Sequence, residues 1–251
     1  MSAGEARSRT GVWVVAALAA AAAAVLLVPP IAQDQAYHRF ADSRSFCGVP
    51  NGLNVLSNLA FLAAGLAGLA VVASERSVFA AGWERAIGGF FAAGVVLTGL
   101  GSAYYHAAPD DATLVWDRLP LALAFMALFV LVLADRLDAR LARRWALPLL
   151  LLGPLSVLYW RLSDDLRLYG LAQFGPLVTM PALALVRTGA CTGGNWLGAA
   201  FALYAAGKVF ELADASIFAA GGIVSGHTLK HLTAAAAAAA LVAWLALRTR
   251  R

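Results

Sequence analysis

Eight long apolar stretches account for most of this chain, and they restrict it to a membrane-protein fold. They cover residues 11–31, 53–73, 86–107, 113–134, 145–160, 169–187, 195–213 and 228–247. About 20 consecutive apolar residues are enough for a helix to cross a bilayer. Only 13% of the residues are charged, against about 25% in soluble domains. Because the lipid core satisfies no backbone hydrogen bonds, we predict helices throughout.

These stretches and their connections use nearly the whole sequence, which leaves no room for a separate soluble domain. We predict an all-α polytopic membrane bundle in which residues 1–251 form one integral membrane domain. Its core is a set of seven helices over 53–247, and 11–31 forms one additional N-terminal transmembrane helix. That stretch follows Arg7 and Arg9, as in a cleaved signal peptide. Its length favours a retained anchor.

The chain has a net charge of +5. If successive helices cross the membrane in alternating directions, the loops on one side contain many more arginines than the loops on the other side. Cytoplasmic loops are enriched in Lys and Arg, so the richer side and both termini are predicted to be cytoplasmic. No recognition motif accompanies the basic residues, so nucleic-acid binding is not predicted. The Arg-rich, Ala-rich and Lys-poor composition is typical of bacteria from GC-rich lineages, which indicates the inner membrane. The richer side carries Arg7, Arg9, Arg76, Arg85, Arg136, Arg140, Arg143, Arg144, Arg187, Arg248, Arg250 and Arg251, and the other side carries Arg39, Arg44, Arg161 and Arg167.

Five polar side chains in or beside the apolar stretches form two patterns. Ser102, His106 and Asp117 follow the spacing Ser-x3-His-x10-Asp. His227 and His231 follow the spacing His-x3-His. Alternating helix directions place all five near the outer end of the bundle, at similar depth for a rise of about 1.5 Å per residue. Since ionisable groups inside a bilayer are costly and face a polar interior, these residues are functional candidates.

The residue types in these patterns indicate metal-assisted hydrolysis. Three histidines with an open fourth position are typical of a catalytic zinc site, and His227 and His231 project from one helix face. Asp117 has the chemistry of a general base and acid. Ser102 is able to hydrogen-bond a developing oxyanion. In a membrane-embedded pocket, the natural substrate of such a site is a lipid.

Two other classes of function remain open at this point. A receptor or sensor would use the three histidines for a structural metal, and a metal or proton transporter would use buried His and Asp as a relay. Asp117 also has structural alternatives, an ion pair with Arg118 or a helix cap. Ser102 and Asp117 favour hydrolysis, because three histidines and a water suffice for a structural site. The almost wholly apolar inner halves of the helices argue against a transporter.

The other polar residues near the outer side have simpler interpretations. His38 is interpreted as a solvated loop residue, and Lys208 and Glu211 as an i, i+3 ion pair. Glu211 and Asp214 are interpreted as a solvated rim of the pocket. The loop 32–52 is hypothesised to fold over the site as a lid, because of its length and its side of the membrane.

Four sequence pieces carry a resemblance to a known family. In order and spacing they resemble the alkaline ceramidase family, part of a superfamily of seven-helix membrane hydrolases that includes the adiponectin-type receptors. The resemblance covers about 53–247, and the helix at 11–31 is an addition to it. The pieces are Asn54-Val-Leu-Ser57-Asn58-Leu-Ala-Phe61, Gly101-Ser102-Ala-Tyr-Tyr-His106, Trp116-Asp117-Arg118 and Gly226-His227-Thr-Leu-Lys-His231.

The resemblance implies a zinc-dependent amidase. It implies that His106, His227 and His231 bind Zn²⁺. It also implies that Ser102 and Asp117 complete the catalytic set. The expected reaction splits ceramide or a related N-acyl lipid into a long-chain base and a fatty acid.

Two features of the sequence depart from what the resemblance implies. Eukaryotic members also hold calcium through an acidic segment before the first core helix. Here the loop 32–52 contains only two acids, Asp34 and Asp42, so a calcium site is not expected. The second feature is the composition, which is typical of bacteria. Many bacteria lack ceramide, so the identity of the lipid amide stays open.

Overall fold

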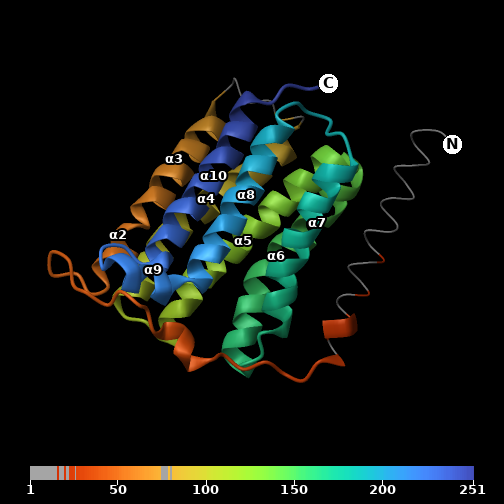
Figure 1. Ribbon diagram of the computed structural model, residues 1–251. Coiled ribbons are helices and arrows are strands. Elements are labelled where there is room, and N and C mark those ends of the chain that lie inside the picture. Colours follow the sequence, from red (N-terminus) through yellow and green to blue (C-terminus); the bar gives the residue numbers. More distant parts are fainter. Residues whose placement is uncertain (1–15, 17–19, 21–22, 26, 75–78, 80) are drawn as a thin grey trace.

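The computed structural model describes residues 16, 20, 23–25, 27–74, 79 and 81–251, and these form a bundle of roughly parallel and antiparallel helices (Figure 1). No β-strand occurs among the described residues, which contain isolated bridges only. The elements are the 3-10 turn η1 (Gln35–His38) and the helices α2 (Gly52–Leu56), α3 (Leu59–Ala73), α4 (Gly82–Ala107), α5 (Asp111–Arg136), α6 (Ala139–Ser163), α7 (Arg167–Val186), α8 (Gly194–Leu212), α9 (Asp214–Gly221) and α10 (Gly226–Leu247).

The described residues contain six helical segments long and apolar enough to cross a membrane. The first of them joins α2 and α3 into one span, Gly52–Ala73. A seventh span results if α8 and α9, which meet at a bend of 72°, are counted together. The prediction of an all-α membrane bundle is confirmed to this extent. Most of the additional helix predicted at 11–31 lies outside the described residues.

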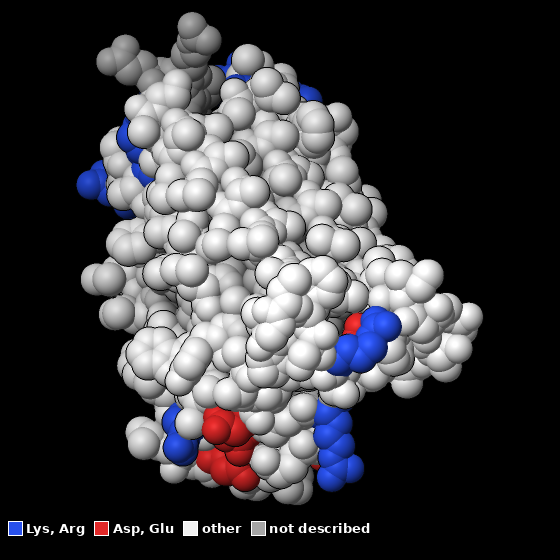
Figure 2. All heavy atoms as spheres, turned by 90° about the vertical axis from the view of Figure 1, so that its left-hand side faces the viewer, with Lys and Arg blue, Asp and Glu red and all other residues white. Residues whose placement is uncertain are grey.

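The distribution of charge on the surface agrees with a membrane bundle. In Figure 2 the charged side chains lie toward the two ends of the molecule, and the broad band between them is almost entirely uncharged. Large apolar side chains are exposed on the helices long and apolar enough to cross a membrane, among them Leu66, Leu97, Leu151 and Val178. In a soluble protein so much exposed apolar surface would mark an interface, whereas on helices of this length and composition it is suited to contact with lipid.

Helix α5 lies at the centre of the bundle. It packs against α4, α6 and α7, while α10 packs against α3 and α8. The middle of α5 is buried on all sides and contains the fully buried side chains of Ala127, Val130, Leu131 and Val132. A helix that is apolar all round is expected in such a position.

Helix α6 is longer than the apolar stretch 145–160 from which it was predicted. Helix α6 begins at Ala139, after Asp138, whose side chain accepts a hydrogen bond from the backbone N–H of Leu141 and caps the helix. Its first turns carry three exposed arginines, Arg140, Arg143 and Arg144, so the helix begins before the apolar stretch. The prediction was too short because it followed hydropathy alone.

The turn between α4 and α5 positions two candidate site residues. Asp110 accepts a hydrogen bond from the backbone N–H of Thr113 and forms a capping box with it. This bond holds the pKa of Asp110 below its ordinary value. Gly101 lies against the backbone of the facing helix, since a Cβ there would meet the carbonyl oxygen of Trp116 at 1.9 Å. The two helices therefore approach closely beside Ser102 and Asp117.

Candidate metal centre and adjoining pocket

Three histidine side chains converge near the end of the bundle where the loop 32–52 lies. His106 comes from the last turn of α4, and His227 and His231 come from the first turns of α10. The Nε2 atom of His106 lies 3.1 Å from Nε2 of His231 and 3.3 Å from Nε2 of His227. All three residues are buried, and one ligand atom from each lies within 4.8 Å of the others. The predicted convergence is confirmed, and the cluster is able to hold a metal ion.

A serine from α2–α3 fixes the orientation of one imidazole. The Ser57 hydroxyl donates to the backbone oxygen of Asn54 at 3.0 Å and lies 2.7 Å from Nδ1 of His231. If its single hydrogen is used for Asn54, Ser57 accepts from Nδ1–H of His231. The Nε2 lone pair of His231 then points into the cluster, as a metal ligand requires.

We predict that Ser57→Ala weakens metal binding by about 10–100-fold, because a hydrogen-bonded partner orients a metal-ligating histidine. The measurement is a competition between the purified protein and a chelator of known affinity. Ser163→Ala is the matched control, since Ser163 is exposed and bonds only to the backbone of its own helix. Equal affinities of the wild type and Ser57→Ala would contradict this role.

A second layer of hydrogen bonds fixes the start of α10. Ser225 caps the helix through the backbone N–H of Thr228. The Thr228 hydroxyl donates to Oδ1 of Asn54 at 2.8 Å, and Nδ2 of Asn54 donates to the backbone oxygen of Asp42. The backbone N–H of His227 donates to Asp214 at 2.7 Å. Asp214, interpreted from the sequence as a solvated rim residue, therefore holds α10 in place.

The loop 32–52 packs over the histidine cluster at this end of the bundle. The Phe40 ring packs against the rings of His106 and His227, with centroids 4.6 and 4.7 Å apart. The interpretation of His38 as solvated was wrong, because only 10% of its side chain is exposed. Its ring nitrogens lie 2.9 Å from the Tyr105 hydroxyl and 3.0 Å from the Asp111 carboxylate. A residue in a long loop is buried here because the loop folds back onto α4 and α5.

The two acids of this loop are already engaged within it. Asp34 caps η1 through the backbone N–H of Ala36. Asp42 is bound by the guanidinium of Arg44 at 2.8 and 2.9 Å. The hydrogen bonds from Arg44 hold the pKa of Asp42 below its ordinary value.

Ser102 and Asp117 face each other across the close contact of α4 and α5. Both side chains line the same pocket. Ser102 is buried, and Asp117 is half-buried. The structural alternatives for Asp117 are not realised: Asp110 is the N-cap of α5, and among the described residues Asp117 forms no ion pair with Arg118.

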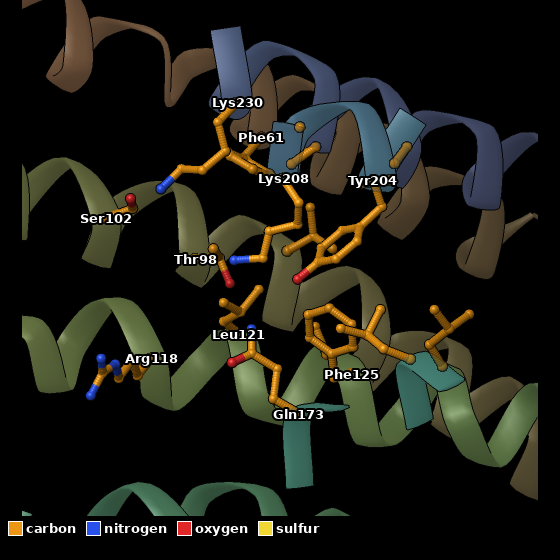
Figure 3. A pocket seen from close by; sticks show the side chains of 18 of the residues that line it. Phe61, Thr98, Ser102, Arg118, Leu121, Phe125, Gln173, Tyr204, Lys208 and Lys230 are labelled. Atoms are coloured by element: carbon orange, nitrogen blue, oxygen red, sulfur yellow. The ribbon is translucent and has the colours of Figure 1, made fainter. Parts of the chain in front are cut away.

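A pocket of about 340 Å³ connects this pair to the interior of the bundle. Ser102, Asp117 and His231 line its outer part, and residues such as Leu128, Met180 and Leu241 line its inner part. In Figure 3 its polar side chains, including Lys208 and Lys230, lie among apolar ones such as Phe61, Leu121 and Phe125. An apolar chamber with a few polar groups at one end is the usual form of a small-molecule site.

The ion pair predicted between Lys208 and Glu211 is present, with Nζ and Oε2 2.5 Å apart. The interpretation of Glu211 as a solvated rim residue was wrong, because its side chain lines the pocket and is only 21% exposed. Lys230 of α10 forms a second ion pair with Glu211 at 3.0 Å. The sequence around Lys230 did not predict this ion pair, because Glu211 lies 19 residues away.

Comparisons with known proteins leave the site to be interpreted from its own geometry. No protein-family model matches the chain, and neither curated proteins nor solved structures give a significant match.

Proposed function

We propose that the protein is a zinc-dependent membrane hydrolase that cleaves the amide bond of ceramide or a related N-acyl lipid. The observation that carries the proposal is a pocket inside an apolar bundle that is lined by Ser102, Asp117 and His231. His231 is one of the three clustered histidines that could hold a metal ion. A purely structural metal would leave the Ser102–Asp117 pair on the pocket wall unexplained.

The histidine cluster fits a zinc ion in number and in type of donor. His106, His227 and His231 would hold it through nitrogen atoms, and the group within reach contains no fourth protein ligand among the described residues. Three protein ligands are typical of catalytic zinc, whereas structural sites have four. Zinc bound in this way polarises a carbonyl group and makes water nucleophilic at neutral pH.

Asp117 and Ser102 then have separate parts in the reaction. The Asp117 carboxylate takes a proton from the attacking water and returns it to the departing amine nitrogen. The Ser102 hydroxyl, which lines the same pocket as Asp117, donates to the oxygen on which negative charge develops. The products are a fatty acid and a free amine.

The form of the pocket supports a lipid as substrate. Its inner part lies between the membrane-spanning helices and is lined by apolar side chains, which suits an acyl chain. The positively charged loops on the opposite side favour an extracytoplasmic position for the site. A bacterial inner membrane with both termini in the cytoplasm is the corresponding localisation.

The test is a screen of N-acyl lipids and total lipid extracts against the purified protein, with metal analysis of the same sample. We expect about one zinc per chain and release of fatty acid from at least one lipid amide. A protein that binds zinc but releases no fatty acid from any extract would instead indicate a sensor with a structural metal. Metal-dependent transport in vesicles without hydrolysis would indicate a transporter.

A further inference from the structure

The polar part of the pocket carries more positive than negative side chains. The acidic and basic residues that line it are Asp117, Glu211, Arg118, Lys208 and Lys230. The last two are the only lysines in the chain. Three cations therefore face two carboxylates inside a membrane-spanning bundle, where each unbalanced charge is costly.

The two lysines share one carboxylate. The Nζ atoms of Lys208 and Lys230 lie 2.5 and 3.0 Å from the two oxygens of Glu211. One negative charge thus serves two positive ones, and the lysines reach it from two different helices, α8 and α10. This triad keeps a net positive charge on the pocket wall.

Arg118 is the cation for which the described residues supply no carboxylate. Its side chain is 6% exposed, and its Nη1 atom is buried without a hydrogen-bond acceptor. Among the described residues no carboxylate forms an ion pair with it. The guanidinium lies over the rings of Tyr37, Trp160 and Tyr169, with 5.3, 4.3 and 4.9 Å from Cζ to the ring centroids.

The aromatic rings explain how Arg118 is held on the wall of the pocket. They do not explain why its guanidinium has no hydrogen-bond acceptor for Nη1. Cation–π contacts stabilise the charge and fix the plane of the guanidinium. The rings accept no hydrogen bond from the N–H groups that point outward in the plane of the guanidinium. These N–H groups are arranged to bind both oxygens of a carboxylate or a similar oxyanion. A buried charge is normally paired, so the vacant partner of Arg118 is expected to come from the ligand.

We propose that this part of the pocket is an anion subsite, and that the substrate is an N-acyl lipid carrying an acidic group such as a carboxylate or a sulfonate. Arg118 would bind that group through its free donors, and the Lys208–Glu211–Lys230 triad would add a positive field. The inference rests on the proposed amidase function and narrows its substrate class. It makes a neutral ceramide a poorer substrate than an acidic lipid amide of equal length.

Two pairs of compounds test the subsite. N-oleoylglycine and N-oleoylglycinamide differ in charge but scarcely in size, and each has a ketone analogue in which a methylene group replaces the amide nitrogen. Binding of the two ketones to wild-type protein in nanodiscs is measured by isothermal titration calorimetry, and cleavage of the two amides by fatty-acid release. N-oleoyltaurine, with a sulfonate, shows which acidic group is preferred.

We expect the wild type to bind the acidic ketone about 10–100-fold more tightly than the neutral one, as for a charged hydrogen bond. Arg118→Gln should remove most of this preference, and Arg118→Lys should retain part of it. Arg140→Gln, at an exposed position away from the pocket, should leave it unchanged. Tight binding of the neutral ketone by Arg118→Gln would show that the variant is folded.

The outcomes separate the two proposals. Equal binding of the acidic and neutral ketones by the wild type overturns the anion subsite, whatever the variants do. An unchanged preference in Arg118→Gln overturns the assignment to Arg118. Preferential binding of the acidic ketone without cleavage of any amide supports the subsite and contradicts the amidase function.

Discussion

Asp117→Asn is expected to lower the rate of amide hydrolysis by about 10²–10⁴-fold, the usual contribution of a positioned general acid–base group. Asparagine has nearly the same size as aspartate, but its amide cannot take a proton from water at neutral pH. Asp117 is not one of the three residues able to hold a metal, so the variant should still contain about one zinc per chain. The measurements are fatty-acid release and metal content of the same purified sample.

The matched control for this variant is Asp138→Asn. Asp138 caps α6 and does not line the pocket, and asparagine caps a helix as well as aspartate does. The control should keep wild-type activity and metal content. If Asp117→Asn were fully active, Asp117 would not be the proton carrier. If it lost its metal as well, Asp117 would act by supporting the metal centre.

Much of the histidine cluster was predictable because helix geometry and membrane topology fix it. The i, i+4 spacing puts His227 and His231 on one face of α10. The short turn after α4 makes α4 and α5 neighbours, so Ser102 and Asp117 fall at one level. What remained an assumption was the proximity of α10 to α4, and the distances of 3.1 and 3.3 Å between histidine nitrogens confirm it.

The partners that complete the site were not predictable, since they depend on side-chain contacts across distant helices. Ser57 lies 174 positions from His231, and no periodicity connects them. Glu211 lies near the end of a predicted helix, where an acidic residue is normally solvated. Only the packing of α8 against α10 brings Lys230 to it. Arg118 reads as a partner of Asp117 in the sequence, but adjacent helical residues point in different directions. Its aromatic neighbours come from three separate elements.

His231→Ala should remove both the bound metal and the hydrolytic activity. Two histidines then remain, and the Ser57 hydroxyl that contacts Nδ1 of His231 loses its partner. A ligand that binds the folded state stabilises it by about 2.7 kcal/mol at 100 times its Kd. Wild-type protein stripped with a chelator should therefore melt at a higher temperature after zinc is added back, whereas His231→Ala should show no such increase.

The control for the metal centre is His38→Ala. His38 is a half-buried histidine at the same end of the bundle, but it bonds to Tyr105 and Asp111 rather than to the cluster. It should keep about one zinc per chain and the zinc-dependent increase in melting temperature. Restored zinc should also restore hydrolysis in the stripped wild type. A His231→Ala protein that bound zinc as tightly as the wild type would show that the three imidazoles hold no common ion.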